Sequence, residues 1–350
     1  MEKLRWTNSE IRKLFRMGER YKSVQTLYNA EERGEIPKAE REPRGKVSTR
    51  VWDISQLPEI GKKYGFLKRP TNEQLVICKY MQKGGVAKTT TTYNDARIMA
   101  LNGIKVIIIG LDPELSITDI SLPHREVLRL DELENQKGLY HFFADKVDIN
   151  SIIKPTSIPT LDIIPETHEL VLLDKWLSQE KRREYVFQDR LMPLLSEYDV
   201  VMFDNSPTWN HLVENSLVVS GHVSMPLGCN LLAYNASATN MENVYDFQSV
   251  MNLSEQNIVM FSTLLDRNSL SQQINATYLQ AYFEDIISTP IRRSVKFEEA
   301  LMSKQSILEY APSSVPAEEY YHFILEEWYR INNSNPLSVA EMPFAELAEV

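Results

Sequence analysis

Cysteine is almost absent from this chain, with only Cys78 and Cys229 among 350 residues. Two cysteines cannot build a disulfide scaffold, and neither stands in the Cys/His spacing of a metal site. The sequence therefore excludes disulfide-stabilised proteins and cysteine-ligated metal proteins. We expect both cysteines to be buried small residues in a protein of a reducing compartment.

Long apolar runs are also lacking. No stretch is long enough to cross a bilayer, and no signal-peptide pattern is present. Hydrophobic residues make up 43% of the chain, enough for one large core and a small accessory domain. We expect a cytoplasmic protein without a membrane partner.

Basic residues are unevenly distributed. Residues 1–70 contain 17 Lys and Arg against 10 Asp and Glu, although the whole chain has a net charge of −10. A basic segment joined to an acidic body favours a nucleic-acid contact on the basic side. The segment 335–350 contains three glutamates and no basic residue, and we expect an acidic tail there.

Residues 83–90, KGGVAKTT, form a glycine-rich loop between an apolar run at 75–80 and a helical pattern at 90–102. Glycines let successive N–H groups point at phosphate oxygens, and the following helix adds its positive end. We expect Lys88 to reach the β and γ phosphates and Thr89 to offer its hydroxyl to Mg²⁺. The expected nucleotide-binding residues are Gly84, Gly85, Val86, Ala87, Lys88, Thr89 and Thr90.

Two carboxylates follow strand-like runs. Asp112 comes after the run at 105–109, and Asp204 ends the run at 199–204. Open α/β sheets bind ligands at the carboxyl ends of their strands. A carboxylate at the tip of the second run can hold the water shell of Mg²⁺ opposite the loop, so we assign Asp204 to the metal site.

The early Lys83, the GLDPE segment at 110–114 and the DNSP segment at 204–207 occur in the order of a known family. From about residue 75 to 331 the chain resembles the deviant Walker A ATPases, and among them the ParA family of plasmid and chromosome partition ATPases. Several positions depart from the family. Ala87 replaces the commoner glycine, Gly110 replaces the usual first aspartate, and Glu114 stands where glutamine is usual. Asn205 and Ser206 replace more usual small or proline residues.

This resemblance implies a P-loop NTPase fold, a mostly parallel twisted α/β sheet with helices on both faces. It also implies an ATP-sandwich homodimer, in which Lys83 reaches the partner's phosphates. Asp112 would position or activate the attacking water and contribute to the metal site. Arg267 and Ile291 would lie on the adenine side.

The same resemblance implies the partners. A ParB-type centromere-binding protein would stimulate a slow hydrolysis, and the ATP state would coat nucleoid DNA without sequence preference. Candidate residues for this DNA surface are Arg292, Arg293 and Lys296. Polymerisation on DNA stays open.

The first seventy residues show a different pattern. We expect helices at 8–17 and 23–33, separated by Gly18, then a basic hairpin at 41–52 and a linker at 62–70. This segment resembles a MerR-like winged helix-turn-helix. DNA would be contacted by Thr26 and Tyr28 on the recognition helix and by Arg44, Lys46 and Arg50 near the wing.

The predicted organisation is a DNA-binding domain with linker at 1–70, an ATPase domain at 71–334 and the acidic tail at 335–350. Alternatives remain for function. The helices at the start could be a dimerisation arm, and the protein could be an ATP-switched site-specific repressor without a transport role. Related iron–sulfur electron donors need cysteines that this chain lacks, and the acidic tail argues against a membrane-associated MinD-like protein.

Overall fold

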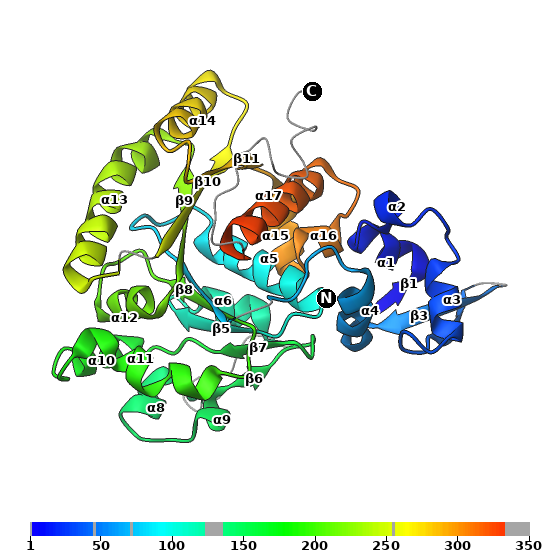
Figure 1. Cartoon of the computed structure of the whole chain (residues 1–350), viewed down its shortest axis with the longest axis horizontal. Helices are drawn as coiled ribbons and strands as arrows, with labels where there is room; N and C mark the ends of the chain where they lie inside the picture. The colour runs from blue at the N-terminus through cyan, green and yellow to red at the C-terminus, as the bar shows by residue number, and fades with distance from the viewer. Residues whose placement is uncertain (1, 45–46, 71–72, 123–135, 254–255, 333–350) are drawn as a thin grey trace.

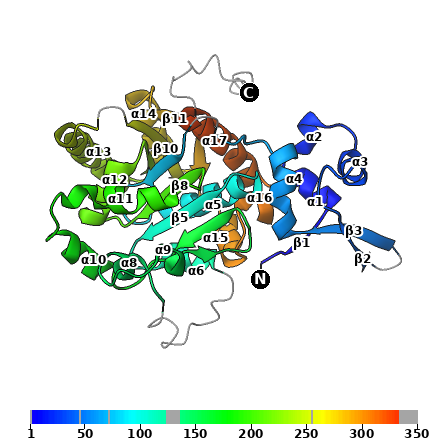
Figure 2. The same ribbon diagram turned by 60° about the horizontal axis from the view of Figure 1, so that its bottom comes forward.

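The computed structural model describes residues 2–44, 47–70, 73–122, 136–253 and 256–332 (Figure 1). An α/β body forms the larger part, and a smaller N-terminal part lies at its side next to α16 and α17, as a second view also shows (Figure 2). Lys46 and the predicted acidic tail at 335–350 lie outside the described residues.

A sheet of eight strands forms the centre of the body, in the order β11-β10-β9-β4-β8-β5-β7-β6. All neighbouring strands are parallel except β6, which is antiparallel to β7. The strands are β4 (Leu75–Lys79), β5 (Val106–Leu111), β6 (Lys154–Pro155), β7 (Leu161–Ile164), β8 (Val200–Asn205), β9 (His222–Gly228), β10 (Asn257–Leu265) and β11 (Ile286–Arg292).

Helices cover both faces of this sheet. Alternate residues of β5 enter different cores: Ile108 packs in one core with α5 and α17, whereas Ile107 and Ile109 pack in another with α10. The mostly parallel α/β fold is therefore confirmed. The helices of the body are α5 (Lys88–Leu101), α6 (Ser116–Ser121), α8 (Leu139–Phe143), α9 (Ile149–Ile152), α10 (Leu170–Leu177), α11 (Val186–Arg190), α12 (His211–Val219), α13 (Leu231–Met251), α14 (Ser269–Ala281), α15 (Val295–Met302), α16 (Ile307–Tyr310) and α17 (Val315–Asn332).

The N-terminal part combines short helices with an antiparallel sheet of order β1-β3-β2. Its buried Trp6 and Trp52 face each other across paired strands. The elements are β1 (Arg5–Thr7), α1 (Asn8–Leu14), α2 (Met17–Arg20), α3 (Thr26–Glu32), β2 (Glu40–Arg44), β3 (Val47–Asp53) and α4 (Leu57–Tyr64).

The break between the first helices lies earlier than the sequence suggested. The first helix ends at Leu14, and Arg16 adopts a left-handed backbone with φ of 50°. Gly18 does not end a helix, because it lies inside α2. The expected position was wrong because the left-handed backbone at Arg16 interrupts the helix before Gly18 is reached.

The N-terminal part is packed firmly onto the body. Lys62 and Lys63 belong to α4 rather than to a linker, and α4 crosses the C-terminal end of α5. At Gly61 the two helices approach so closely that a Cβ atom would lie 1.8 Å from the Leu101 carbonyl oxygen. Trp52 and Tyr321 belong to one continuous core, so the two parts are held in a fixed relative orientation.

Candidate nucleotide-binding site

The glycine-rich loop connects β4 to α5 at the carboxyl edge of the sheet. Gly85 has a φ of +71°, and a Cβ atom built on Gly84 or Gly85 would meet nothing within 4 Å. The loop backbone is therefore open on the side where phosphates would lie. Ala87 has a φ of 68°, a conformation that costs an alanine about 1 kcal/mol.

Lys88 begins α5 and lies over the loop. Its side chain is largely buried, and Nζ donates a hydrogen bond of 2.9 Å to the Lys83 carbonyl oxygen. Burial lowers the pKa of the Lys88 ammonium, while the carboxylates of Asp204, Asp112 and Glu114 oppose that shift. These acidic groups therefore share one electrostatic environment with the lysine.

Asp204 is fully buried near the end of β8 and is held by two hydroxyls of α5. Thr89 Oγ1 donates to Asp204 Oδ2 and Thr92 Oγ1 donates to Asp204 Oδ1, both at 2.8 Å. Burial raises the pKa of the Asp204 carboxyl to about 6, although the two hydroxyls lower it. The sequence analysis missed Thr92, but its spacing of three residues from Thr89 places both on one helix face.

The Thr89 and Asp204 side chains fit a magnesium site of the kind that accompanies phosphates. No group of three or more His, Cys, Asp or Glu side chains among the described residues is arranged to hold a metal ion. Mg²⁺ in nucleotide sites needs few protein ligands, since phosphates and water supply the others. Thr89 and Asp204 supply one hydroxyl and one carboxylate at the loop, which is a sufficient number of protein ligands for such a site.

Asp112 directly follows Leu111, the last residue of β5. Its Oδ1 accepts a hydrogen bond of 3.1 Å from the Glu114 N–H, and its own N–H donates to Glu166 Oε1 at 3.3 Å. Asp112 also influences the pKa values of Lys88 and Asp204 through its charge. The structure thus brings Lys88, Asp112 and Asp204 together from three segments.

Glu166, just beyond β7, was not anticipated. Its side chain is 1% exposed, and burial together with the charge of Asp204 raises its pKa well above the usual range. The carboxylate is bound by α6: Oε2 accepts from the Thr118 N–H and from Thr118 Oγ1, both at 3.2 Å. The only signal in the sequence was the unusual Gly110, against which Glu166 packs.

A buried ion cluster lies directly below the loop. Lys79 at the end of β4 is fully buried, and its Nζ lies 2.7 Å from Asp95 Oδ2 and 2.6 Å from Glu327 Oε1. Tyr320 OH donates to Asp95 Oδ1 at 2.6 Å. The cluster connects β4, α5 and α17, so the base of the loop is fixed by charge as well as by apolar packing.

Residues 74–258 match a family model described as an AAA domain. The chain is 30% identical over 247 residues to the sporulation initiation inhibitor protein Soj of Bacillus subtilis, an alignment that covers 70% of this chain and 94% of Soj. The chain belongs to the ParA/Soj family of partition ATPases.

Solved structures extend this likeness at the level of the fold. Cobyrinic acid a,c-diamide synthase from Mycobacterium smegmatis, with bound ADP and magnesium, has a TM-score of 0.60 at 23% identity and covers 75% of this chain and 98% of its own. A solved partition protein has a TM-score of 0.64 at 12% identity and covers 94% of this chain and 93% of its own. The second match is long enough to include most of the N-terminal part.

The two residues expected on the adenine side of this partition ATPase lie in different surroundings. Arg267 is exposed after β10, the strand whose Thr263 Oγ1 donates to the Val86 carbonyl oxygen of the loop at 3.0 Å. Ile291 is 5% exposed and packs in the core. A contact of Ile291 with adenine would therefore come from its backbone, and its place on the adenine side stays a prediction.

Several of the expected DNA contacts are occupied by acidic neighbours. Arg50 Nε lies 3.3 Å from Glu31 Oε2, and Arg50 Cζ lies 4.7 Å from the centroid of the Tyr28 ring. Arg292 forms an ion pair with Glu319. Each of these two arginines is paired with a carboxylate, and their contacts with DNA stay a prediction. The sequence showed their charge but not their partners.

The other expected DNA contacts differ in position. Thr26 Oγ1 donates to the Ser23 carbonyl oxygen at the start of α3, and Tyr28 follows on the same helix. Arg293 is exposed and Lys296 half-buried at the start of α15. Arg44 ends β2, and its side chain, like all of Lys46, lies outside the described residues.

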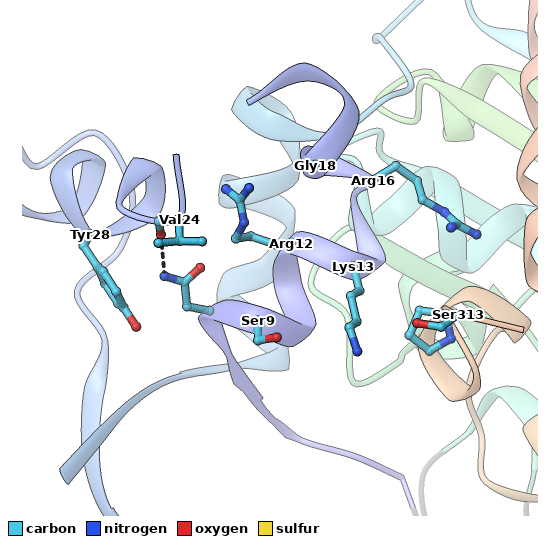
Figure 3. Close-up of a pocket in the computed structure, with 10 residues that line it drawn as sticks. Ser9, Arg12, Lys13, Arg16, Gly18, Val24, Tyr28 and Ser313 are labelled. Atoms are coloured by element: carbon cyan, nitrogen blue, oxygen red, sulfur yellow. Dashed lines mark hydrogen bonds between the residues drawn. The ribbon is translucent and has the colours of Figure 1, made fainter. Parts of the chain in front are cut away.

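A basic hollow of about 540 Å³ lies between the N-terminal helices and the turn before α17. Its lining includes Arg12, Lys13, Arg16 and Tyr28 from the N-terminal part and Ser313 from the body. Figure 3 shows Lys13 extending from α1 to the side of the hollow that Ser313 lines. Both parts of the partition ATPase therefore contribute to this basic surface.

The described helices include none that combines the length and the apolar character needed to span a membrane.

Proposed function

We propose that this chain is an ATP-dependent DNA segregation ATPase of a plasmid or another low-copy replicon. The observation that carries the proposal is the 2.8 Å hydrogen bond between Thr89 Oγ1 and Asp204 Oδ2 beside an open glycine loop. A hydroxyl and a carboxylate in contact at the start of a helix suit a nucleoside triphosphate with Mg²⁺. Membership of the ParA/Soj family supports ATP as this nucleotide.

Each residue of the site has a task in hydrolysis. The N–H groups of the loop and Lys88 would neutralise the phosphates, while Thr89 would ligate Mg²⁺ and Asp204 would hold its water shell. Bound Mg²⁺ supplies positive charge against the charge that develops on the phosphate oxygens. Asp112 would orient the attacking water. Little covalent chemistry is required of the protein, so positioning and electrostatics carry the rate.

Dimerisation would couple nucleotide binding to DNA binding. Lys83 at the start of the open loop would reach the phosphates of a second copy, so that ATP stabilises the dimer and hydrolysis releases it. The dimer would bind nucleoid DNA without sequence preference in the cytoplasm, with Arg293 and Lys296 as contacts. A ParB-type centromere-binding protein would stimulate hydrolysis.

The N-terminal part would bind operator DNA as a winged helix-turn-helix and repress the protein's own operon. In the basic hollow Arg12 donates to the Ser23 and Tyr21 carbonyl oxygens and Arg16 pairs with Glu318. Lys13 of the same hollow supports a phosphate contact beside Tyr28 on α3. The firm packing of α4 on α5 favours a second candidate function, an ATP-switched repressor without a transport role, because a rigid junction can transmit the nucleotide state.

The test is DNA binding with ATP, with ADP and without nucleotide, to a non-specific duplex and to the protein's own promoter region. We expect ATP to switch on sequence-independent binding in the wild type and not in Lys88→Ala. Binding restricted to the promoter, and equal in ATP and ADP, would replace the segregation function with the repressor.

A further inference from the structure

Gly110 on β5 is packed against a side chain that comes from a different strand. In the sheet register Gly110 lies opposite Asp204 of β8. A Cβ atom on Gly110 would lie 2.3 Å from Glu166 Cγ and 2.9 Å from Glu166 Cδ, distances that real side chains do not show. The side chain of Glu166, together with Ile117 Cγ2 at 2.9 Å from the same Cβ position, therefore occupies the space that any larger residue at position 110 would fill.

The Glu166 carboxylate is fixed in this space by three donors. Oε2 accepts from the N–H and the hydroxyl of Thr118, and Oε1 accepts from the N–H of Asp112. The Glu166 N–H in turn donates to Thr118 Oγ1 at 2.8 Å, which anchors the end of β7 to α6. The carboxylate of Glu166 therefore joins the backbone of Asp112 to α6.

Stability alone does not explain a carboxylate at this position. Glu166 is 1% exposed, it lies near the charges of Asp204 and Asp112, and none of the ion pairs found among the described residues includes it. Burying an acidic group beside two others disfavours the folded state unless the group has another use.

We propose that Glu166 is a positioning residue for ATP hydrolysis, whose carboxylate fills the space above Gly110 and orients Asp112 by accepting its N–H. It replaces, from β7, the carboxylate that related ATPases usually carry on β5 at position 110. The inference rests on the proposed ATPase function and adds to it the residue that holds the water-orienting aspartate.

The experiment compares steady-state ATP hydrolysis of wild type, Glu166→Ala, Glu166→Gln and the double variant Gly110→Asp/Glu166→Ala. Glu166→Ala should lower kcat roughly 10- to 100-fold, because small displacements of a water-orienting group are costly. Glu166→Gln should stay much closer to wild type, because its amide oxygen can still accept the Asp112 N–H. The KM for ATP should stay within about twofold, since the loop and Lys88 are unchanged. In the double variant the introduced aspartate side chain would enter the emptied space, and kcat should recover to within about threefold of wild type.

Asp162→Asn is the matched control, because Asp162 is a partly buried carboxylate on the same strand, held by Tyr198 away from the loop. Its kcat should equal that of wild type. Melting temperatures show which variants fold, and if Glu166→Ala does not, the double variant decides the result.

The outcomes separate the inference from the function on which it rests. If wild type and Lys88→Ala release phosphate equally slowly, the ATPase function fails and the role of Glu166 fails with it. If wild type hydrolyses ATP and Lys88→Ala does not, but a folded Glu166→Ala keeps full kcat, only the inference is overturned. A folded double variant that recovers nothing would also overturn it.

Discussion

The nucleotide loop and the N-terminal part both carry basic residues, but they use them differently. At the loop, Lys88 is the cation of a site formed with Asp112 and Asp204, and the space above the glycines is open. In the N-terminal part, Arg50 is already paired with Glu31. A surplus of positive charge therefore does not by itself make a phosphate-binding surface, and the arrangement of acidic partners decides which cations stay available.

The largest expected effect tests the loop side of this comparison. Lys88→Ala should lower the rate of ATP hydrolysis by about 10²- to 10³-fold, because it removes a preorganised cation from the phosphates. Phosphate release at saturating ATP measures the effect. Lys181→Ala, which changes an exposed lysine elsewhere, should keep the wild-type rate.

The next effect concerns the junction between the two regions. Gly61→Ala should lower the free energy of unfolding by about 3 kcal/mol, because its Cβ atom would overlap the Leu101 carbonyl oxygen. Gly18→Ala is the matched control, since nothing lies within 4 Å of its Cβ position and alanine favours a helix. Denaturant unfolding of both variants measures the difference. Equal stability would mean that α4 is free to move away from α5.

A smaller effect concerns a histidine that the body keeps uncharged. Burial lowers the pKa of His222 from 6.5 to about 4. Between these pH values His222 is protonated in the unfolded chain and neutral in the folded protein. The stability that the protein gains from keeping His222 neutral is fully present above pH 6.5 and is lost as the pH falls toward 4. We expect wild type to lose about 2 kcal/mol more than His222→Gln across this interval. Denaturant unfolding at several pH values measures the free energy of unfolding of both proteins. If this free energy falls with pH equally in wild type and in His222→Gln, the expectation is contradicted.

The smallest effect tests the N-terminal side. Lys13→Ala should weaken promoter binding about threefold to tenfold and reduce the salt dependence by about one phosphate contact, because Lys13 lines the basic hollow. Arg50→Ala should weaken it less, since Arg50 is paired with Glu31. Titrations of promoter DNA at several salt concentrations measure both. If Arg50→Ala weakens promoter binding more than Lys13→Ala, the phosphate contact lies at the β2–β3 hairpin and not in the hollow.

Local patterns predicted the parts of the fold that depend on contiguous residues. The run 105–109 gave β5 because β-branched residues suit a buried strand, and the segment 83–90 gave the loop because glycine and lysine spacing specifies it. Contacts between distant segments left no such pattern. Thr92 reaches Asp204 across 112 positions, and Arg292 meets Glu319 only because β11 lies beside α17.

By itself, then, the sequence determined the loop and the two strand-end carboxylates, because each follows from short-range periodicity and backbone sterics. Its resemblance to a known family implied the α/β class. Tertiary structure alone decided which charges stay available and which are paired, and it brought Glu166 into the space left by Gly110. The physical reason is that electrostatic and steric interactions depend on the distance between side chains in space and not on their separation along the chain. Only the assembled sheet brings β5, β7 and β8 to the same edge.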